Sequence, residues 1–123
     1  MQDLIQQQRY KVKQYLSYTQ RLCPGCMGKL HGQGDAHHLF VRRGPDHALL
    51  YFPINIVLIH NSCHLEESTE MQYTAAIWKL NTYGPDAIEA WVESLPFKQT
   101  PDLPEFYWQA KEDYLSGKHR RDY

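Results

Sequence analysis

The sequence has little of what several classes of protein require. Its 123 residues include only three cysteines, an odd number that favours a metal site over a framework of disulfides. No apolar run approaches the roughly 20 residues of a membrane-spanning helix, and the segment 1–16 lacks the continuous apolar stretch of a secretory signal. We therefore expect one domain in the cytoplasm, with no membrane insertion.

The chain also lacks an excess of charge of either sign, because 13 Lys and Arg against 14 Asp and Glu give a formal net charge of -1. This average conceals an asymmetry. Residues 1–64 carry seven basic and three acidic side chains, a net of +4, whereas residues 65–123 carry six basic and eleven acidic side chains, a net of -5. All three cysteines and six of the seven histidines lie in the basic half, so near-neutrality does not exclude a nucleic-acid partner.

Apolar spacing and turn residues predict an α+β fold with helices at both ends of the chain. Pro53 interrupts the longest apolar run, which argues against one long central strand there. Asn61 or Ser62 can cap a helix that runs toward Glu70. The other expected elements are helices over 3–20, 71–82, 85–95 and 104–116, and strands over 36–41 and 56–59.

Two short segments each contain a pair of side chains of the types that bind metals. Cys23-Pro-Gly-Cys26 is a CxxC turn, and His60-Asn-Ser-Cys63 repeats the same spacing further along the chain. Zn²⁺ accepts three thiolates and one imidazole in a tetrahedron, and a closed site with four protein ligands is structural. The sequence therefore predicts a structural zinc site made of these four residues.

Two alternatives to this zinc site remain open. A CxxC such as Cys23–Cys26 is also the motif of thiol redox proteins, an interpretation that predicts no bound zinc and no use of Cys63. Within the zinc interpretation, either His31 or His47 could serve as the fourth ligand in place of His60.

A second set of residues interleaves with the zinc pattern. His37 and His38 lie on a predicted strand, Asn55 stands at the start of the next one, and His64 directly follows a cysteine of the zinc set. The segments AHHLF and INIVLIHNSCH resemble the motif of the HNH endonucleases, also called the ββα-metal or His-Me finger family. The resemblance is to the zinc-stapled subgroup of that family.

The resemblance covers about residues 22–70 and departs from the subgroup at His60, where a cysteine is usual. It implies a single HNH domain over residues 1–123. That domain would be an α+β fold with a small zinc-stapled ββα-metal core, an N-terminal helix and a C-terminal helical part over about 71–116.

The resemblance further implies a metal-dependent endonuclease that hydrolyses phosphodiester bonds of DNA, by nicking or double-strand cleavage, in a phage or mobile-element setting within a bacterial host. It assigns His38 as the general base, and Asn55 as a residue that braces the loop or orients His38. His37 and His64 would hold one catalytic divalent cation, such as Mg²⁺, Mn²⁺, Ni²⁺ or Zn²⁺. A neutral imidazole can accept the proton of water, and a cation can stabilise charge on the phosphate.

Arg42 and Arg43 directly follow the strand with the histidine pair, where their guanidinium groups could contact DNA phosphates. The competing interpretation is a non-catalytic zinc-binding module that binds DNA or a protein. The complete HNH-like set of residues favours the enzyme over this module, because a purely structural zinc ribbon does not need two adjacent histidines, an asparagine and a final histidine. The acidic half of the chain, residues 65–123, offers a surface for a protein partner.

Overall fold

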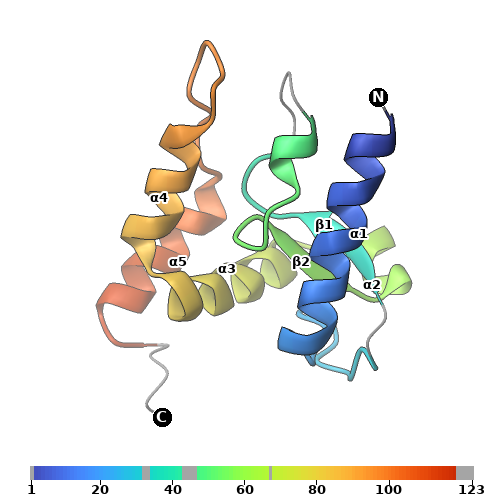
Figure 1. Ribbon diagram of the computed structural model, residues 1–123. Helices are drawn as coiled ribbons and strands as arrows, with labels where there is room; N and C mark the ends of the chain where they lie inside the picture. Colours follow the sequence, from blue (N-terminus) through green and yellow to red (C-terminus); the bar gives the residue numbers. More distant parts are fainter. Residues whose placement is uncertain (1, 32–33, 43–46, 67, 119–123) are drawn as a thin grey trace.

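The computed structural model describes residues 2–31, 34–42, 47–66 and 68–118. In this part of the chain it shows a small α+β fold with five α-helices and a two-stranded antiparallel sheet (Figure 1). The elements are, in chain order, α1 (Gln2–Thr19), β1 (Asp35–His38), the 3-10 helix η1 (His47–Leu50), β2 (Ile56–Ile59), α2 (Asn61–Glu66), α3 (Thr69–Tyr83), α4 (Pro85–Ser94) and α5 (Glu105–Leu115).

The sheet lies between α1 and the helices that follow it in the chain (Figure 1). β1 pairs with β2 so that His37 faces Val57 and His38 faces Ile56. All four residues of β2 are buried, and α1 contacts β2, with its own apolar side chains in the same core. α2 follows β2 directly and contacts β1, which completes a β-β-α unit.

Two expected elements differ from the structure in their length. The strand expected over 36–41 ends at His38. The Leu39 N–H still donates to the backbone carbonyl of Asn55, but the Phe40 and Val41 N–H groups donate to the Asn55 side chain instead of to a neighbouring strand. The helix expected to run from Asn61 toward Glu70 is split into α2 and α3. Ser68 lies between the two helices in an extended conformation and caps α3 by accepting a hydrogen bond from the Met71 N–H at 3.1 Å.

The C-terminal half is helical, as expected, and α3 connects it to the sheet (Figure 1). Gly84 ends α3 with φ 86°, a conformation that favours glycine, and Pro85 begins α4. Tyr107 of α5 is fully buried, and its hydroxyl donates to Glu89 of α4 at 2.7 Å. None of the helices in the described ranges is both long and apolar enough to cross a membrane.

Lys79 is a buried cation in the middle of α3. Its side chain is only 7% exposed, and its ammonium group donates to the Pro53 carbonyl at 2.5 Å and lies 5.9 Å from the ring centroid of Tyr83. Burial lowers the pKa of Lys79 from 10.5 to about 7, because the charged form loses its hydration.

Replacing Lys79 by Met should remove a pH dependence of stability. Between about pH 7 and pH 10.5 the unfolded chain keeps the Lys79 proton while the folded chain has lost it. The unfolded state then binds more protons, so the free energy of unfolding rises with pH by up to about 1.4 kcal/mol per unit. Urea unfolding between pH 7 and pH 9 should show this rise in the wild type and a smaller one in Lys79→Met. An equal rise in both proteins would contradict the assignment.

Candidate metal centre and histidine cavity

The four predicted zinc ligands come together in the structure. The ligand atoms of Cys23, Cys26, His60 and Cys63 all lie within 4.8 Å of one another. A tetrahedron with Zn–S bonds of about 2.3 Å and Zn–N bonds of about 2.0 Å places its ligand atoms on the order of 4 Å apart. The donor set and its spacing are therefore compatible with a structural zinc ion.

The turn between the first two ligands has the local structure that such a site needs. The Cys23 N–H donates to the Gly28 carbonyl at 2.9 Å, and the Gly28 N–H donates to the Cys26 sulfur at 3.4 Å. Gly25 is required by space, since a Cβ atom there would lie 2.7 Å from the Cβ of Cys63 and 2.9 Å from its sulfur. The turn therefore packs directly against the first turn of α2.

His60 is the histidine that completes this cluster. Its Nδ1 lies 3.2 Å from the Cys26 sulfur, and its Nε2 lies 3.0 Å from the Lys29 carbonyl oxygen. An Nε2–H that donates to this carbonyl leaves the lone pair on Nδ1, which faces the thiols. His31 lies outside the cluster, and the side chain of His47 lies outside the described part of the structure.

The thiols of the cluster do not ionise equally by themselves. A hydrogen bond from the Gly28 N–H, and then one from His60, lowers the pKa of Cys26 to about 7. Burial, and then the neighbouring Cys23 and Cys26, raises the pKa of Cys63 to about 11. Three adjacent thiolates need a positive charge between them, which a divalent cation would supply. The cluster also uses Cys63 and His60, which a redox pair of Cys23 and Cys26 does not require.

A second site surrounds a cavity of about 490 Å³ beside the sheet. The rings of His37 and His64 meet edge to face with their centroids 5.5 Å apart. The ring of His38 lies against Tyr51, with centroids 4.7 Å apart. The residues that line this cavity are Arg9, Ala36, His37, His38, Arg42, Tyr51 and His64. All three histidines of the HNH-like motif therefore face one cavity.

The end of β1 allows both adjacent histidines to reach this cavity. Side chains of successive strand residues point to opposite faces, so a continuous strand would separate His37 from His38. His37 is 1% exposed and lies inside the strand, whereas His38 is its last residue. The Nε2 atoms of both rings are buried.

Asn55 holds the loop between the two strands. Its Oδ1 accepts hydrogen bonds from the Phe40 and Val41 N–H groups, both at 2.9 Å. Its Nδ2 donates to the carbonyls of Val41 at 2.9 Å and Leu50 at 3.0 Å. The buried amide thus holds the backbone at Phe40, Val41 and Leu50 through hydrogen bonds.

The structure adds Asp35, which the sequence analysis missed, to the surroundings of His64. The Asp35 Oδ2 lies 3.3 Å from the Nδ1 of His64 and accepts a hydrogen bond from the Asn61 side chain at 2.9 Å. The hydrogen bond from Asn61, aided by His64, lowers the pKa of the Asp35 carboxyl. A carboxylate at Nδ1 favours the tautomer with its lone pair on Nε2. The feature of the sequence that could have identified this residue was its position, an acidic side chain just before the histidine pair.

Arginines supply the positive charge of the cavity. Arg42 lines it, and Arg9 reaches it from α1, a distant segment of the chain. No acidic side chain is among its lining residues in the described structure. The other predicted DNA contact, Arg43, lies outside the described residues. The cavity therefore combines imidazoles with guanidinium groups, a combination suited to an anion.

Replacing Cys63 by Ser or Gly25 by Ala should unfold the domain or strongly reduce its stability. Structural zinc contributes about 10–16 kcal/mol of apparent binding free energy, comparable to the whole stability of a domain, about 5–15 kcal/mol. Zinc content by mass spectrometry and thermal unfolding by circular dichroism should both fall. His31→Ala, outside the cluster, should retain both. A stable Cys63→Ser protein with unchanged zinc would rule out the cluster as a zinc site.

No protein-family model, curated protein or solved structure matches this chain. The Cys3His cluster and the small α+β fold are compatible with the zinc-stapled HNH family that the motif resembles.

Proposed function

We propose that this protein is a metal-dependent endonuclease of the HNH type that hydrolyses phosphodiester bonds of DNA. The observation that carries the proposal is the single cavity in which His37, His38 and His64 meet Arg9 and Arg42. The Cys3His cluster lies next to it in the chain, because its last cysteine, Cys63, directly precedes His64.

His38 is the candidate general base. A neutral imidazole near pH 7 accepts a proton from a water molecule, whose oxygen then attacks the phosphorus atom of the scissile phosphate. The bond between phosphorus and the 3′ oxygen breaks, and this oxygen takes up a proton from a second water molecule, which leaves a 5′ phosphate and a 3′ hydroxyl. The edge-to-face contact with Tyr51 holds the His38 ring at the cavity.

His37 and His64 are the candidate ligands of the catalytic cation. Their ring centroids lie 5.5 Å apart, close enough to share one ion with metal–nitrogen bonds of about 2.1 Å. A divalent cation bound there would stabilise negative charge on the phosphate and on the leaving oxygen. Asp35 fixes the orientation of His64 through Nδ1.

Arg9 and Arg42 are the candidate phosphate contacts. Guanidinium groups bind phosphate oxygens through paired, charge-assisted hydrogen bonds, and such contacts position the DNA backbone without reading its sequence. The two arginines come from α1 and from the loop after β1, so they reach the cavity from two separate segments.

The decisive experiment compares the wild type with His38→Ala. The wild type should relax or linearise supercoiled plasmid in the presence of Mg²⁺, Mn²⁺ or Ni²⁺, and a chelator should stop it. Loss of the general base should slow cleavage by about 10²–10⁴-fold, while zinc content and the circular dichroism spectrum stay unchanged.

The matched control for this experiment is His31→Ala, which removes an exposed histidine outside the cavity and should cleave normally. Cleavage by His38→Ala at the wild-type rate would refute the role of His38. A wild type that binds DNA but cuts with none of these cations would instead indicate the non-catalytic zinc-binding module.

Asp35→Asn should weaken the cation site without unfolding the protein. Loss of the carboxylate beside a metal-binding histidine typically costs about 10–100-fold in metal affinity or activity. Calorimetric titration of Mn²⁺ or Ni²⁺ should show the lower affinity, and a higher cation concentration should restore part of the cleavage. Asp102→Asn, which changes an exposed carboxylate outside the cavity, should behave as the wild type. Unchanged cation affinity in Asp35→Asn would exclude this role.

A further inference from the structure

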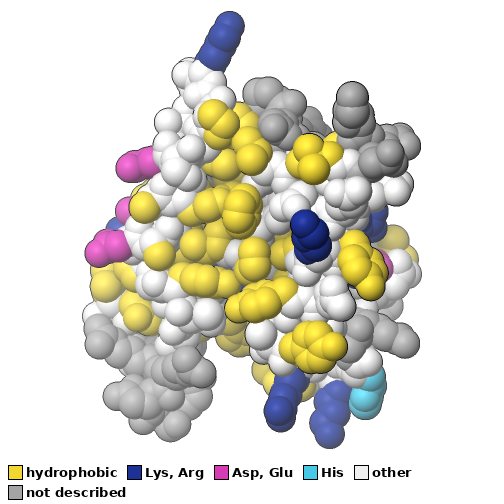
Figure 2. Space-filling view, viewed as in Figure 1, with side chains coloured by type: hydrophobic (Ala, Val, Ile, Leu, Met, Phe, Trp, Pro, Cys, Tyr) yellow, Lys and Arg dark blue, Asp and Glu magenta, His cyan; other side chains and the backbone are white. Residues whose placement is uncertain are grey.

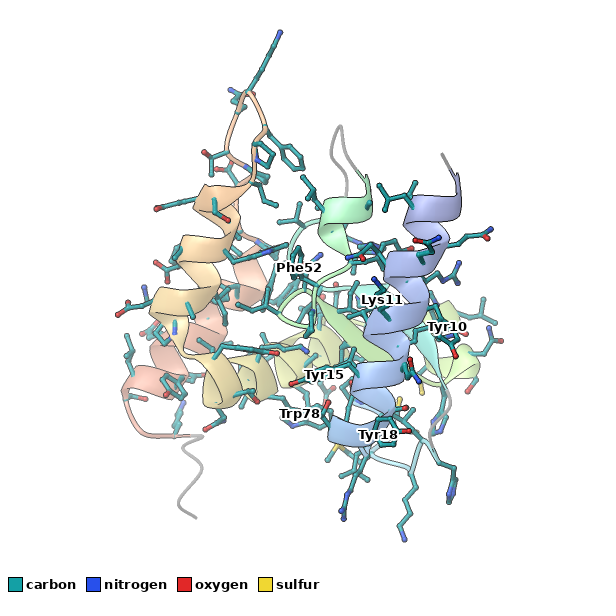
Figure 3. All side chains as sticks on the ribbon, viewed as in Figure 1. Tyr10, Lys11, Tyr15, Tyr18, Phe52 and Trp78 are labelled. Atoms are coloured by element: carbon teal, nitrogen blue, oxygen red, sulfur yellow. The ribbon has the colours of Figure 1, made fainter. Side chains whose placement is uncertain are left out.

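A groove of about 380 Å³, distinct from the histidine cavity, lies between the C-terminal end of α1 and α3. Three aromatic rings line it, those of Tyr15, Trp78 and Tyr83, and Val57 of β2 also contributes to its wall. Tyr15 is 49% exposed although it is a large aromatic side chain. Figure 3 shows Tyr15 and Trp78 next to each other between the two helices. The groove therefore offers aromatic faces to a flat ligand.

The charge of this region favours a negatively charged occupant. The guanidinium of Arg21 lines the groove, and none of the described residues that line it is acidic. The chain from residue 4 to residue 34 contains five Lys and Arg and no Asp or Glu, and residues 71–85 also contain no acidic side chain. In Figure 2 the hydrophobic side chains gather over the middle of this face, and most of the acidic ones lie where α4 and α5 are seen.

Helix α1 contributes side chains to both the groove and the histidine cavity. Arg9 of this helix lines the cavity, and Tyr15 lines the groove. A rise of about 1.5 Å per residue separates these positions by about 9 Å along the helix axis. Val57 of the groove pairs with His37 of the cavity, and the side chains of paired residues lie on the same face of a sheet. One polymeric anion could therefore occupy both sites.

We infer that the groove binds an unpaired base of a single-stranded DNA segment that flanks the phosphate in the histidine cavity. This inference rests on the proposed endonuclease function and names the form of its substrate. Aromatic side chains beside cationic ones are the usual platform for single strands, because every base has a face that can stack. A fully paired duplex keeps those faces inside its own stack. The protein should then prefer single-stranded, flapped or gapped DNA to intact duplex.

The test measures binding separately from cleavage, in a His38→Ala background without added catalytic cation. Fluorescence anisotropy with a labelled oligothymidine should show tighter binding than with a duplex of equal length. Tyr15→Ala should weaken oligothymidine binding by at least about fivefold. The matched control is Tyr10→Ala, which removes a tyrosine of the same helix that is 67% exposed and lies outside the groove. This control should bind as the parent does.

Trp78→Phe provides a second readout that retains an aromatic ring. Oligothymidine should quench the fluorescence of the parent protein, and this quenching should largely disappear in Trp78→Phe while binding persists. Trp91 and Trp108 do not line the groove and serve as the unaffected background. Quenching that remains unchanged in Trp78→Phe would overturn the inference.

Failure of this inference and failure of the proposed function give different results. If both Tyr15→Ala and Arg21→Gln bind oligothymidine as the parent does, the inferred role of the groove is overturned, even if plasmid cleavage occurs. Binding that depends on Tyr15 and Trp78 would support the groove, even if cleavage fails. Two results would assign the groove to another occupant and overturn the inference. One is an acidic peptide that competes for the protein as well as oligothymidine does. The other is a dimer, seen in sedimentation, that Tyr15→Ala dissociates.

Discussion

The side-chain amide of Asn55 is the contact on which the arrangement of the histidine cavity depends. This one buried group accepts two hydrogen bonds and donates two, and together they hold the backbone at Phe40, Val41 and Leu50. They end β1 at His38 and fix the loop that carries Arg42. A buried amide leaves costly unpaired groups if its partners move, so it holds these three backbone positions in one arrangement.

The Cys3His cluster connects the stability of the domain to the geometry of the cavity. It joins the turn at Cys23–Cys26 to His60 and Cys63, two residues that flank the start of α2. Because His64 follows Cys63 directly, closing this cluster also sets the position of a cavity histidine. Asp35 then orients that histidine from the neighbouring strand. The short helix α2 therefore contributes residues to both sites. The cluster holds this helix in place, so the small sheet needs no large core of its own to do so.

The asymmetry of charge along the chain acquires a spatial meaning in the fold. α1 contributes Arg9 to the cavity and Tyr15 to the groove. The acidic C-terminal half forms helices, whose packing includes the contact of Tyr107 and Lys111 with Glu89, each at 2.7 Å. A net charge of -1 for the whole chain therefore conceals a separation of charge between its two halves.

The sequence by itself determined the residue types, the spacing of the four zinc-ligand candidates and of the histidine set, and the α+β class, because these depend on local patterns. The tertiary structure alone decided that Asp35 meets His64, that Arg9 reaches the cavity from α1, and that Ser68 separates two helices. Arg9 and Arg42 lie on segments far apart in the chain, and no periodicity or turn signal relates them. Such contacts form only when separate segments pack together, so local sequence patterns do not contain them.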